Sequence, residues 1–94
     1  MIHTVDNRVR IIYPLNIQEE QIQEIIYTLK GMDLSNKILE LDTDDIAISL
    51  VFYFKELITS DDNIEIKVTP KVYNMLTTNF KEIFDSKRLK VKDE

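Results

Sequence analysis

Residues 64–70 read IEIKVTP, and this stretch decides the fold class of the chain. Its first five residues alternate apolar and charged side chains, which is the pattern of a strand with one buried face and one wet face. The Thr69-Pro70 pair then predicts a helix start, because threonine caps helices and proline suits the first helical position. The stretch therefore predicts a strand that runs directly into a helix.

The same alternation of strand and helix extends over the whole chain. Strands are predicted at residues 8–15, 37–41 and 63–68 and, as a last edge strand, at 89–92. Helices are predicted at 17–30, with Asn16 as the N-cap, at 46–58, and at 70–84 with an interruption at Asn79. This order, β-α-β-α-β-α, is typical of the α/β class. We expect one small domain with a mixed or parallel sheet of three to five strands and with helices packed on it.

Length and composition limit what the chain can be. Its 94 residues, 44% of them hydrophobic, supply one core, so we expect a single domain over residues 1–94 with flexible ends at 1–7 and 93–94. The longest apolar stretch, residues 46–54, is far shorter than the roughly 20 residues that cross a bilayer. We expect no membrane association and a cytoplasmic location, and the absence of cysteine fits a reducing compartment.

The charge of the chain argues against a nucleic-acid partner. Seventeen acidic and twelve basic side chains give a formal charge of -5, which opposes attraction to phosphate. The basic residues at positions 87–92 are interpreted as a solvated tail.

The helices carry their own local signals. The first has an apolar stripe of Ile22, Ile25, Ile26 and Leu29 and ends at Gly31, for which a left-handed conformation is expected. The second is preceded by Thr43, Asp44 and Asp45, which are candidate helix caps. Residues 46–54 are apolar on almost every side, so this helix either fills the core or offers part of its surface to a partner chain.

Residues 38–42, 47–57 and 64–72 together resemble a STAS domain, the fold of bacterial anti-sigma-factor antagonists and of the cytoplasmic tails of sulfate transporters. In that family an acidic strand end leads through a loop to a hydrophobic helix. A polar turn, a strand and a Ser-Pro or Thr-Pro helix start then follow. The resemblance implies a STAS-like fold and a regulatory role in binding another protein.

The chain departs from the STAS pattern at the start of the second helix. Antagonists of that family carry an Asp-Ser-Ser-Gly-like stretch whose serine is phosphorylated, whereas this chain has Thr43-Asp44-Asp45-Ile46. Asp45 falls near the position of that serine. Its permanent carboxylate either resembles the phosphorylated state or, with Asp44, merely caps the helix.

No residue pattern indicates a catalytic chemistry. Residues 7–12 resemble the first strand of a Clp-type protease subunit, but a Gly-Gly oxyanion loop and a nucleophile elbow are missing and His3 stands alone. Asp42, Asp44 and Asp45 are oxygen ligands of the kind that magnesium prefers, yet no glycine-rich phosphate loop accompanies them. Glu40 and Asp42 are expected at a solvated rim. We expect no enzyme activity, no cofactor and no metal site.

Two functions remain. The first is a non-enzymatic, STAS-like module that binds one protein partner through the start of the second helix, with Asp42, Thr43, Asp44, Asp45, Ile46 and Ser49 as the candidate contact residues. The second is a small acidic inhibitor, for example encoded by a phage, that blocks a basic site on a host enzyme or defence protein. Self-association through the apolar helix or an edge strand is also left open.

Overall fold

The computed structural model describes residues 1–60, 62–84 and 87–92, and this part of the chain forms an α/β fold with a mixed sheet, as the sequence predicts. The strands are β1 (Ile2–Val5), β2 (Arg8–Ile11), β3 (Ile38–Leu41), β4 (Glu65–Val68) and β5 (Leu89–Val91). The helices are α1 (Glu19–Lys30), α2 (Ile48–Thr59), α3 (Pro70–Asn79) and α4 (Lys81–Phe84).

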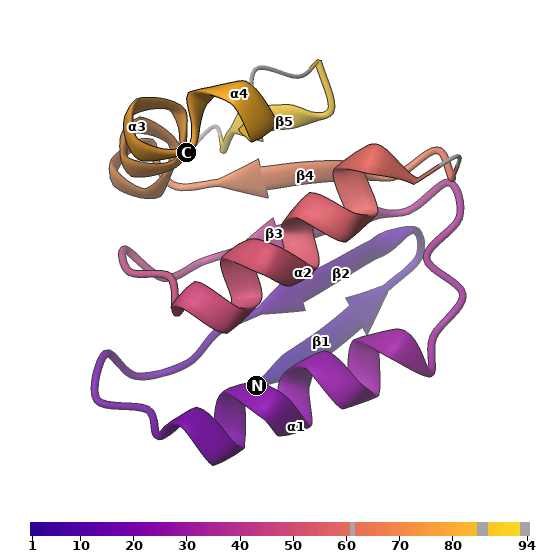
Figure 1. Ribbon diagram of the computed structural model, residues 1–94. Coiled ribbons are helices and arrows are strands. Elements are labelled where there is room, and N and C mark those ends of the chain that lie inside the picture. The colour runs from indigo at the N-terminus through magenta and orange to yellow at the C-terminus, as the bar shows by residue number, and fades with distance from the viewer. Residues whose placement is uncertain (61, 85–86, 93–94) are drawn as a thin grey trace.

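The strands lie in the sheet in the order in which they occur in the chain, β1-β2-β3-β4-β5. β1 and β2 form an antiparallel hairpin, and each strand from β2 onward is parallel to the next. Each parallel pair is joined through a helical crossover, and such crossovers are right-handed. Because every crossover steps in the same direction, the helices cover one face of the sheet, and in Figure 1 α2 crosses in front of the middle strands.

β1 is an element that the sequence patterns do not predict. It lies within residues 1–7 and is joined to β2 by a two-residue turn in which Asp6 has a φ of 54°. Aspartate is among the residues that accept this left-handed region most readily, which explains why no glycine is needed. The expectation for residues 93–94 lies outside the described residues.

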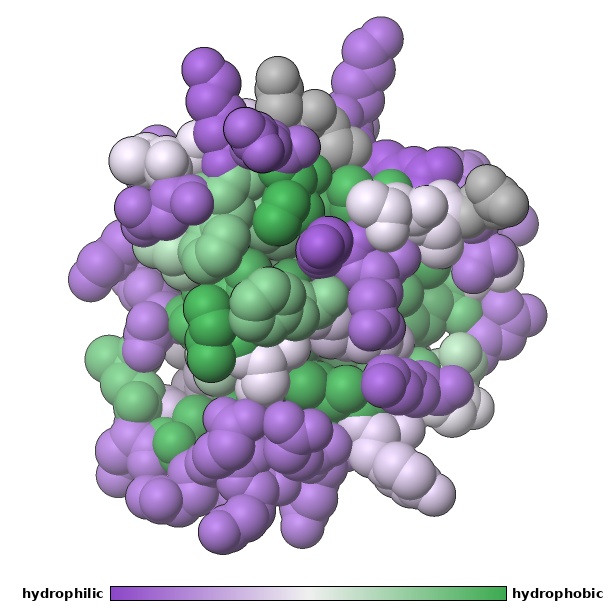
Figure 2. Space-filling model, in the orientation of Figure 1, coloured by the Kyte–Doolittle hydropathy of each residue, from purple (hydrophilic) through white to green (hydrophobic). Residues whose placement is uncertain are grey.

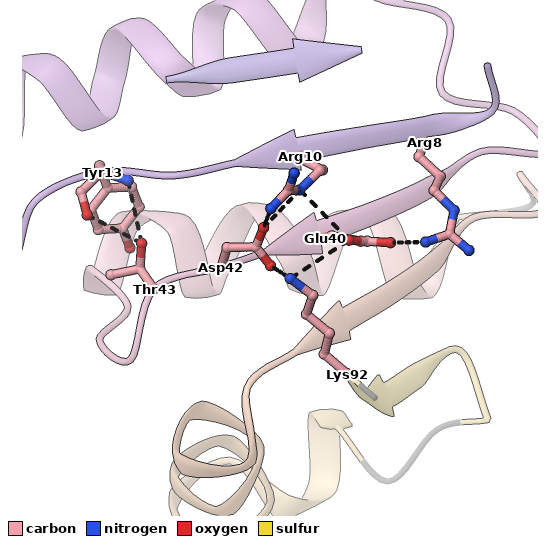
Figure 3. A network of polar contacts seen from close by, with 7 residues as sticks. All are labelled: Arg8, Arg10, Tyr13, Glu40, Asp42, Thr43 and Lys92. Carbon is pink, nitrogen blue, oxygen red and sulfur yellow. Dashed lines mark hydrogen bonds and ion pairs between the residues drawn. The ribbon is translucent and has the colours of Figure 1, made fainter. Parts of the chain in front are cut away.

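The core lies between the sheet and its helices. Alternate strand residues fill it, and the fully buried ones include Val9, Ile11, Leu39, Leu41, Ile66 and Val68. The predicted stripe on α1, residues 22, 25, 26 and 29, is buried against them. The other set of alternate residues faces away from the helices, and we call this side of the sheet the open face (Figure 3).

The ends of α1 differ from the prediction. The helix begins after Gln18, whose backbone N–H donates to the Gln21 side chain at 3.1 Å, rather than after Asn16. The prediction that Gly31 adopts a left-handed backbone conformation is wrong, since its φ is -82°. Its N–H donates to the carbonyl oxygens of Thr28 and Tyr27 in an ordinary helical last turn, so glycine is not required there.

α2 is mainly a core helix. Its buried residues are Leu50, Val51, Tyr53, Phe54, Leu57 and Ile58, whereas Ile48 and Phe52 are exposed. The predicted helix caps are wrong: α2 begins after Ala47, and no side chain caps it. Asp44 and Asp45 lie in the loop ahead of the helix start. None of the helices that the structure describes is long and apolar enough to span a lipid bilayer.

The C-terminal third follows the prediction closely. Thr69 caps α3, because its Oγ1 accepts the Val72 N–H at 3.4 Å, and Pro70 is the first helical residue. The helix ends at Asn79, and residues 81–84 form the separate turn α4. β5 is the predicted edge strand, parallel to β4.

Candidate functional site

The residues predicted to bind a partner do not all lie on one surface. Asp44 and Asp45 are exposed and Ser49 is half-buried, but Thr43 and Ile46 are only 6% and 7% exposed. Asp42, as the next residue after β3, turns its side chain to the open face (Figure 3). The structure therefore brings Asp44 and Asp45 to the start of α2 and separates Asp42 from them.

The loop ahead of α2 is fixed at its base by Tyr13 and Thr43. The Thr43 hydroxyl donates to the Tyr13 carbonyl oxygen at 3.2 Å and accepts the Tyr13 N–H at 3.3 Å. The Tyr13 hydroxyl then donates to the carbonyl oxygen of Asp45 at 2.9 Å. Burial raises the pKa of Tyr13 to about 12, so this hydroxyl stays protonated as a donor at neutral pH. The loop thus holds Asp44 and Asp45 in a defined position.

Two exposed apolar side chains follow these carboxylates in the sequence, within the first two turns of α2. Ile48 and Phe52 lie one turn apart on α2 and are 56% and 52% exposed. Figure 2 shows apolar atoms across the middle of the helical side, where α2 runs in Figure 1. We call Asp44, Asp45, Ile48 and Phe52 together the α2 entry surface. Exposed apolar groups beside fixed charges are typical of a protein-binding surface.

Ser49 lies on the side of α2 that approaches α1. Its Oγ is buried without a hydrogen-bond partner of good geometry among the described residues. The Glu19 carboxylate at the start of α1 is nevertheless close to it. A hydrogen bond from Gln23, and secondly the proximity of Ser49, hold the pKa of Glu19 below its usual range. Ser49 therefore takes part in the contact between the two helices.

The open face carries an ion network that the sequence patterns do not predict. Arg8 Nη1 donates to Glu40 Oε1 at 2.8 Å, and Arg10 Nε donates to Asp42 Oδ2 at 2.8 Å. Lys92 of the segment after β5 pairs with Asp42, and its Nζ lies 3.9 Å from Glu40 Oε2 (Figure 3). Three cations thus surround two carboxylates across β2, β3 and the end of β5.

The expectation that Glu40 and Asp42 form a solvated rim is wrong. Glu40 is 3% exposed, and the side chain of Asp42 is 8% exposed. Burial of a carboxylate costs several kcal/mol unless it is paired and hydrogen-bonded, and the three cations meet that need. The sequence does carry a signal for this network, because charged residues occupy alternate positions in and just after β2, β3 and β5. Only the strand register shows that these charges lie side by side.

The carboxylates show no arrangement for a metal ion. Asp42 faces Arg10 and Lys92, away from Asp44 and Asp45, so the predicted carboxylate cluster is dispersed. In the part of the chain that the structure describes, no three histidine, aspartate or glutamate side chains converge on one point. His3 pairs with Arg10 across the β1–β2 hairpin.

Comparisons with protein-family models, with curated proteins and with solved structures found no match for this chain.

Proposed function

We propose that this chain is a non-enzymatic protein-interaction module, STAS-like in its order of elements, that binds one protein partner through the α2 entry surface. The observation that carries the proposal is the exposure of Ile48 and Phe52, more than half of each, beside two exposed carboxylates. The other apolar residues of α2 are buried in the core, whereas more than half of Ile48 and of Phe52 remains open to contact with a partner.

The surface is preorganised for binding. Tyr13 and Thr43 hold the loop by three hydrogen bonds, so a partner pays little ordering cost there. Asp44 and Asp45 do not cap α2, so their charges are available to a partner. This supports the hypothesis that Asp45 acts as a permanent negative charge where STAS antagonists carry a phosphorylatable serine.

The chemistry of the surface defines the partner. Two carboxylates fit lysine or arginine side chains, and Phe52 fits an apolar pocket at the centre of an interface. We expect a partner surface with an apolar depression that is bordered on one side by basic residues.

Capture of the partner tests the proposal. Tagged wild-type protein is compared with Phe52→Ala and with the double variant Asp44→Lys, Asp45→Lys, and captured proteins are identified by mass spectrometry. We expect both variants to lose the same captured protein. The control is Asp62→Lys with Glu82→Lys, which reverses two exposed charges elsewhere and should retain it.

The outcome also separates the two functions. Loss in every charge-reversal variant, together with retention by Phe52→Ala and strong dependence on salt, would favour an acidic inhibitor. Equal capture by all variants would contradict binding through the α2 entry surface. Circular dichroism checks that each variant is folded.

A further inference from the structure

β1 leaves one edge of the sheet unpaired. In the β1–β2 hairpin the Ile12 N–H donates to the Met1 carbonyl oxygen at 2.9 Å, and Ile2 is opposite Ile11. Inward-facing and outward-facing backbone groups alternate in an antiparallel pair, so residues 3 and 5 bond to β2. The N–H and C=O groups of Ile2 and Thr4 therefore point outward. Among the described residues nothing bonds to them.

A cavity lies beside this edge, between β1 and α1. It has a volume of about 280 Å³ and is lined by Met1, Ile2, Gln21, Glu24, Ile25 and Thr28. Pockets for small molecules are roughly 300–1,000 Å³, so this cavity lies at the lower end of that range and has room for one long side chain. A residue paired with Ile2 on an added strand would have its side chain on the helical side of the sheet, above the cavity.

The residues that line the cavity determine which side chain of an added strand would fit there. Ile2 and Ile25 give apolar walls, and Glu24 supplies a carboxylate at an exposed position. A long basic side chain fits this combination, because its methylene stem can lie along apolar groups while its charge meets a carboxylate. Glu20, exposed one turn before Glu24 on α1, adds a second negative charge.

We propose that the β1 edge is a second docking site, at which an extended segment of a partner protein adds as a strand and places an arginine or lysine in the cavity. Backbone hydrogen bonds to Ile2 and Thr4 give affinity, and the cavity gives specificity. A second copy of this chain is a poorer occupant, because pairing of two β1 edges would bring the acidic α1 helices of both copies together. The site is separate from the α2 entry surface.

Titration with a designed peptide tests the site. The probe is an end-blocked peptide of alternating threonine and valine with lysine at each end and arginine at the centre, and its matched version has glutamate at the centre. Amide chemical shifts of the full-length chain report binding. We expect shifts within β1 and residues 21–28, and affinity for the glutamate peptide weaker by roughly tenfold or more.

Two variants examine the two halves of the site. Thr4→Pro removes an outward N–H without removing a β1–β2 hydrogen bond, and we expect roughly fivefold weaker binding. Glu24→Gln changes an exposed side chain and should reduce the preference for arginine over glutamate by roughly fivefold. The double variant Asp44→Lys, Asp45→Lys should bind the peptide as wild type does, which keeps this test independent of the α2 entry surface.

Three results would overturn the proposal. Equal affinity for the two peptides excludes the cavity as a basic-side-chain site. Shifts that lie on the open face instead of β1 place binding elsewhere. Concentration-dependent association of the chain with shifts at β1, in the absence of peptide, assigns the edge to a second copy. Retained β1–β2 amide contacts in Thr4→Pro show that the hairpin is intact.

Discussion

The two faces of the sheet bury side chains in different ways. On the helical face, Leu39 and Ile66 are fully buried under helices. On the open face no helix covers β3, yet Glu40 is 3% exposed because Arg8, Arg10 and Lys92 lie around it (Figure 3). The difference teaches that long basic side chains can replace a helix as cover for a sheet, since their methylene stems exclude water and their charges remain wet.

The two faces also differ in charge. Among the described residues, the open face holds five cations, Arg8, Arg10, Lys67, Lys90 and Lys92, and three anions, Glu40, Asp42 and Glu65, which leaves +2. The whole chain has a charge of -5, and four of its acidic residues lie outside the described residues. The described residues away from the open face therefore carry -3, so within the described part of the chain the acidic excess lies on the helical side and in the loops, where both proposed docking sites lie.

The largest expected effect is on the helical face. Leu39→Ala removes a fully buried side chain from the central strand, and we expect the free energy of unfolding to fall by about 3–4 kcal/mol. Lys67→Ala on the open face of the neighbouring strand should change it by less than about 0.5 kcal/mol. Urea unfolding measures both. Similar losses in the two variants would show that the faces do not differ as described.

The next effect concerns the ion network. Glu40→Gln removes a buried charge that contacts Arg8, and we expect a loss of about 1.5–2 kcal/mol. Glu65→Gln is the matched control, because the Glu65 side chain is 27% exposed where that of Glu40 is 4% exposed, and should cost no more than about 0.5 kcal/mol. Urea unfolding at low salt gives both values. If Glu40→Gln left the free energy of unfolding unchanged, the ion pairs of Glu40 with Arg8, Arg10 and Lys92 would add nothing to stability.

The raised pKa of the Tyr13 hydroxyl leads us to expect a loss of folding stability at high pH. Its pKa is raised from 10.0 to about 12 by burial, so above pH 10 the unfolded chain gives up this proton before the folded chain does. The contribution of the protonated Tyr13 hydroxyl to the free energy of unfolding is complete below pH 10 and disappears as the pH approaches 12. We expect a loss of about 1–1.5 kcal/mol between pH 9 and pH 11, measured by urea unfolding. Tyr13→Phe should lack this component of the pH dependence.

The smallest effect is expected at the periphery of the open face. Lys90→Gln breaks the pair with Glu65, whose Oε1 lies 2.6 Å from Lys90 Nζ. Because the Lys90 side chain is 57% exposed, we expect a change between 0 and about 0.5 kcal/mol that vanishes in high salt. Thermal unfolding at two salt concentrations measures it. A loss as large as that of Glu40→Gln would remove the distinction between buried and peripheral pairs.

Local patterns predicted much of the fold. Alternation identified β4, helical spacing identified the buried stripe of α1, and Thr69-Pro70 located the start of α3. β1 was missed because Ile2 is its one partly buried residue and the other three are exposed, so the segment lacks the alternation that identifies a strand. The interruption after Asn79 was predicted correctly, and the cap of α2 was not, because several oxygens precede that helix and the chain enters it two residues later.

The site was less predictable because it depends on residues far apart in sequence. Arg8 and Glu40 are 32 positions apart, and Lys92 and Asp42 are 50 apart, so their contacts follow only from strand register. Charge predicts the exposure of Asp44 and Asp45 correctly, but the same reasoning fails for Glu40, which is buried. The exposure of Ile48 and Phe52 could not be predicted, because α2 is apolar on nearly every side and only the packing of its neighbours decides which side remains uncovered.

The identical order of strands in the sheet and in the chain has a consequence for how the protein folds. Each strand pairs with the strand next in sequence. The β1–β2 hairpin is closed by a two-residue turn, whereas the parallel pairings join residues such as Arg8 and Ile38 that are 30 positions apart, so loop closure favours formation of the hairpin before the parallel pairs. The β5 end pairs only with β4, so we expect its amides to exchange with solvent before those of β3, as the first step of local opening.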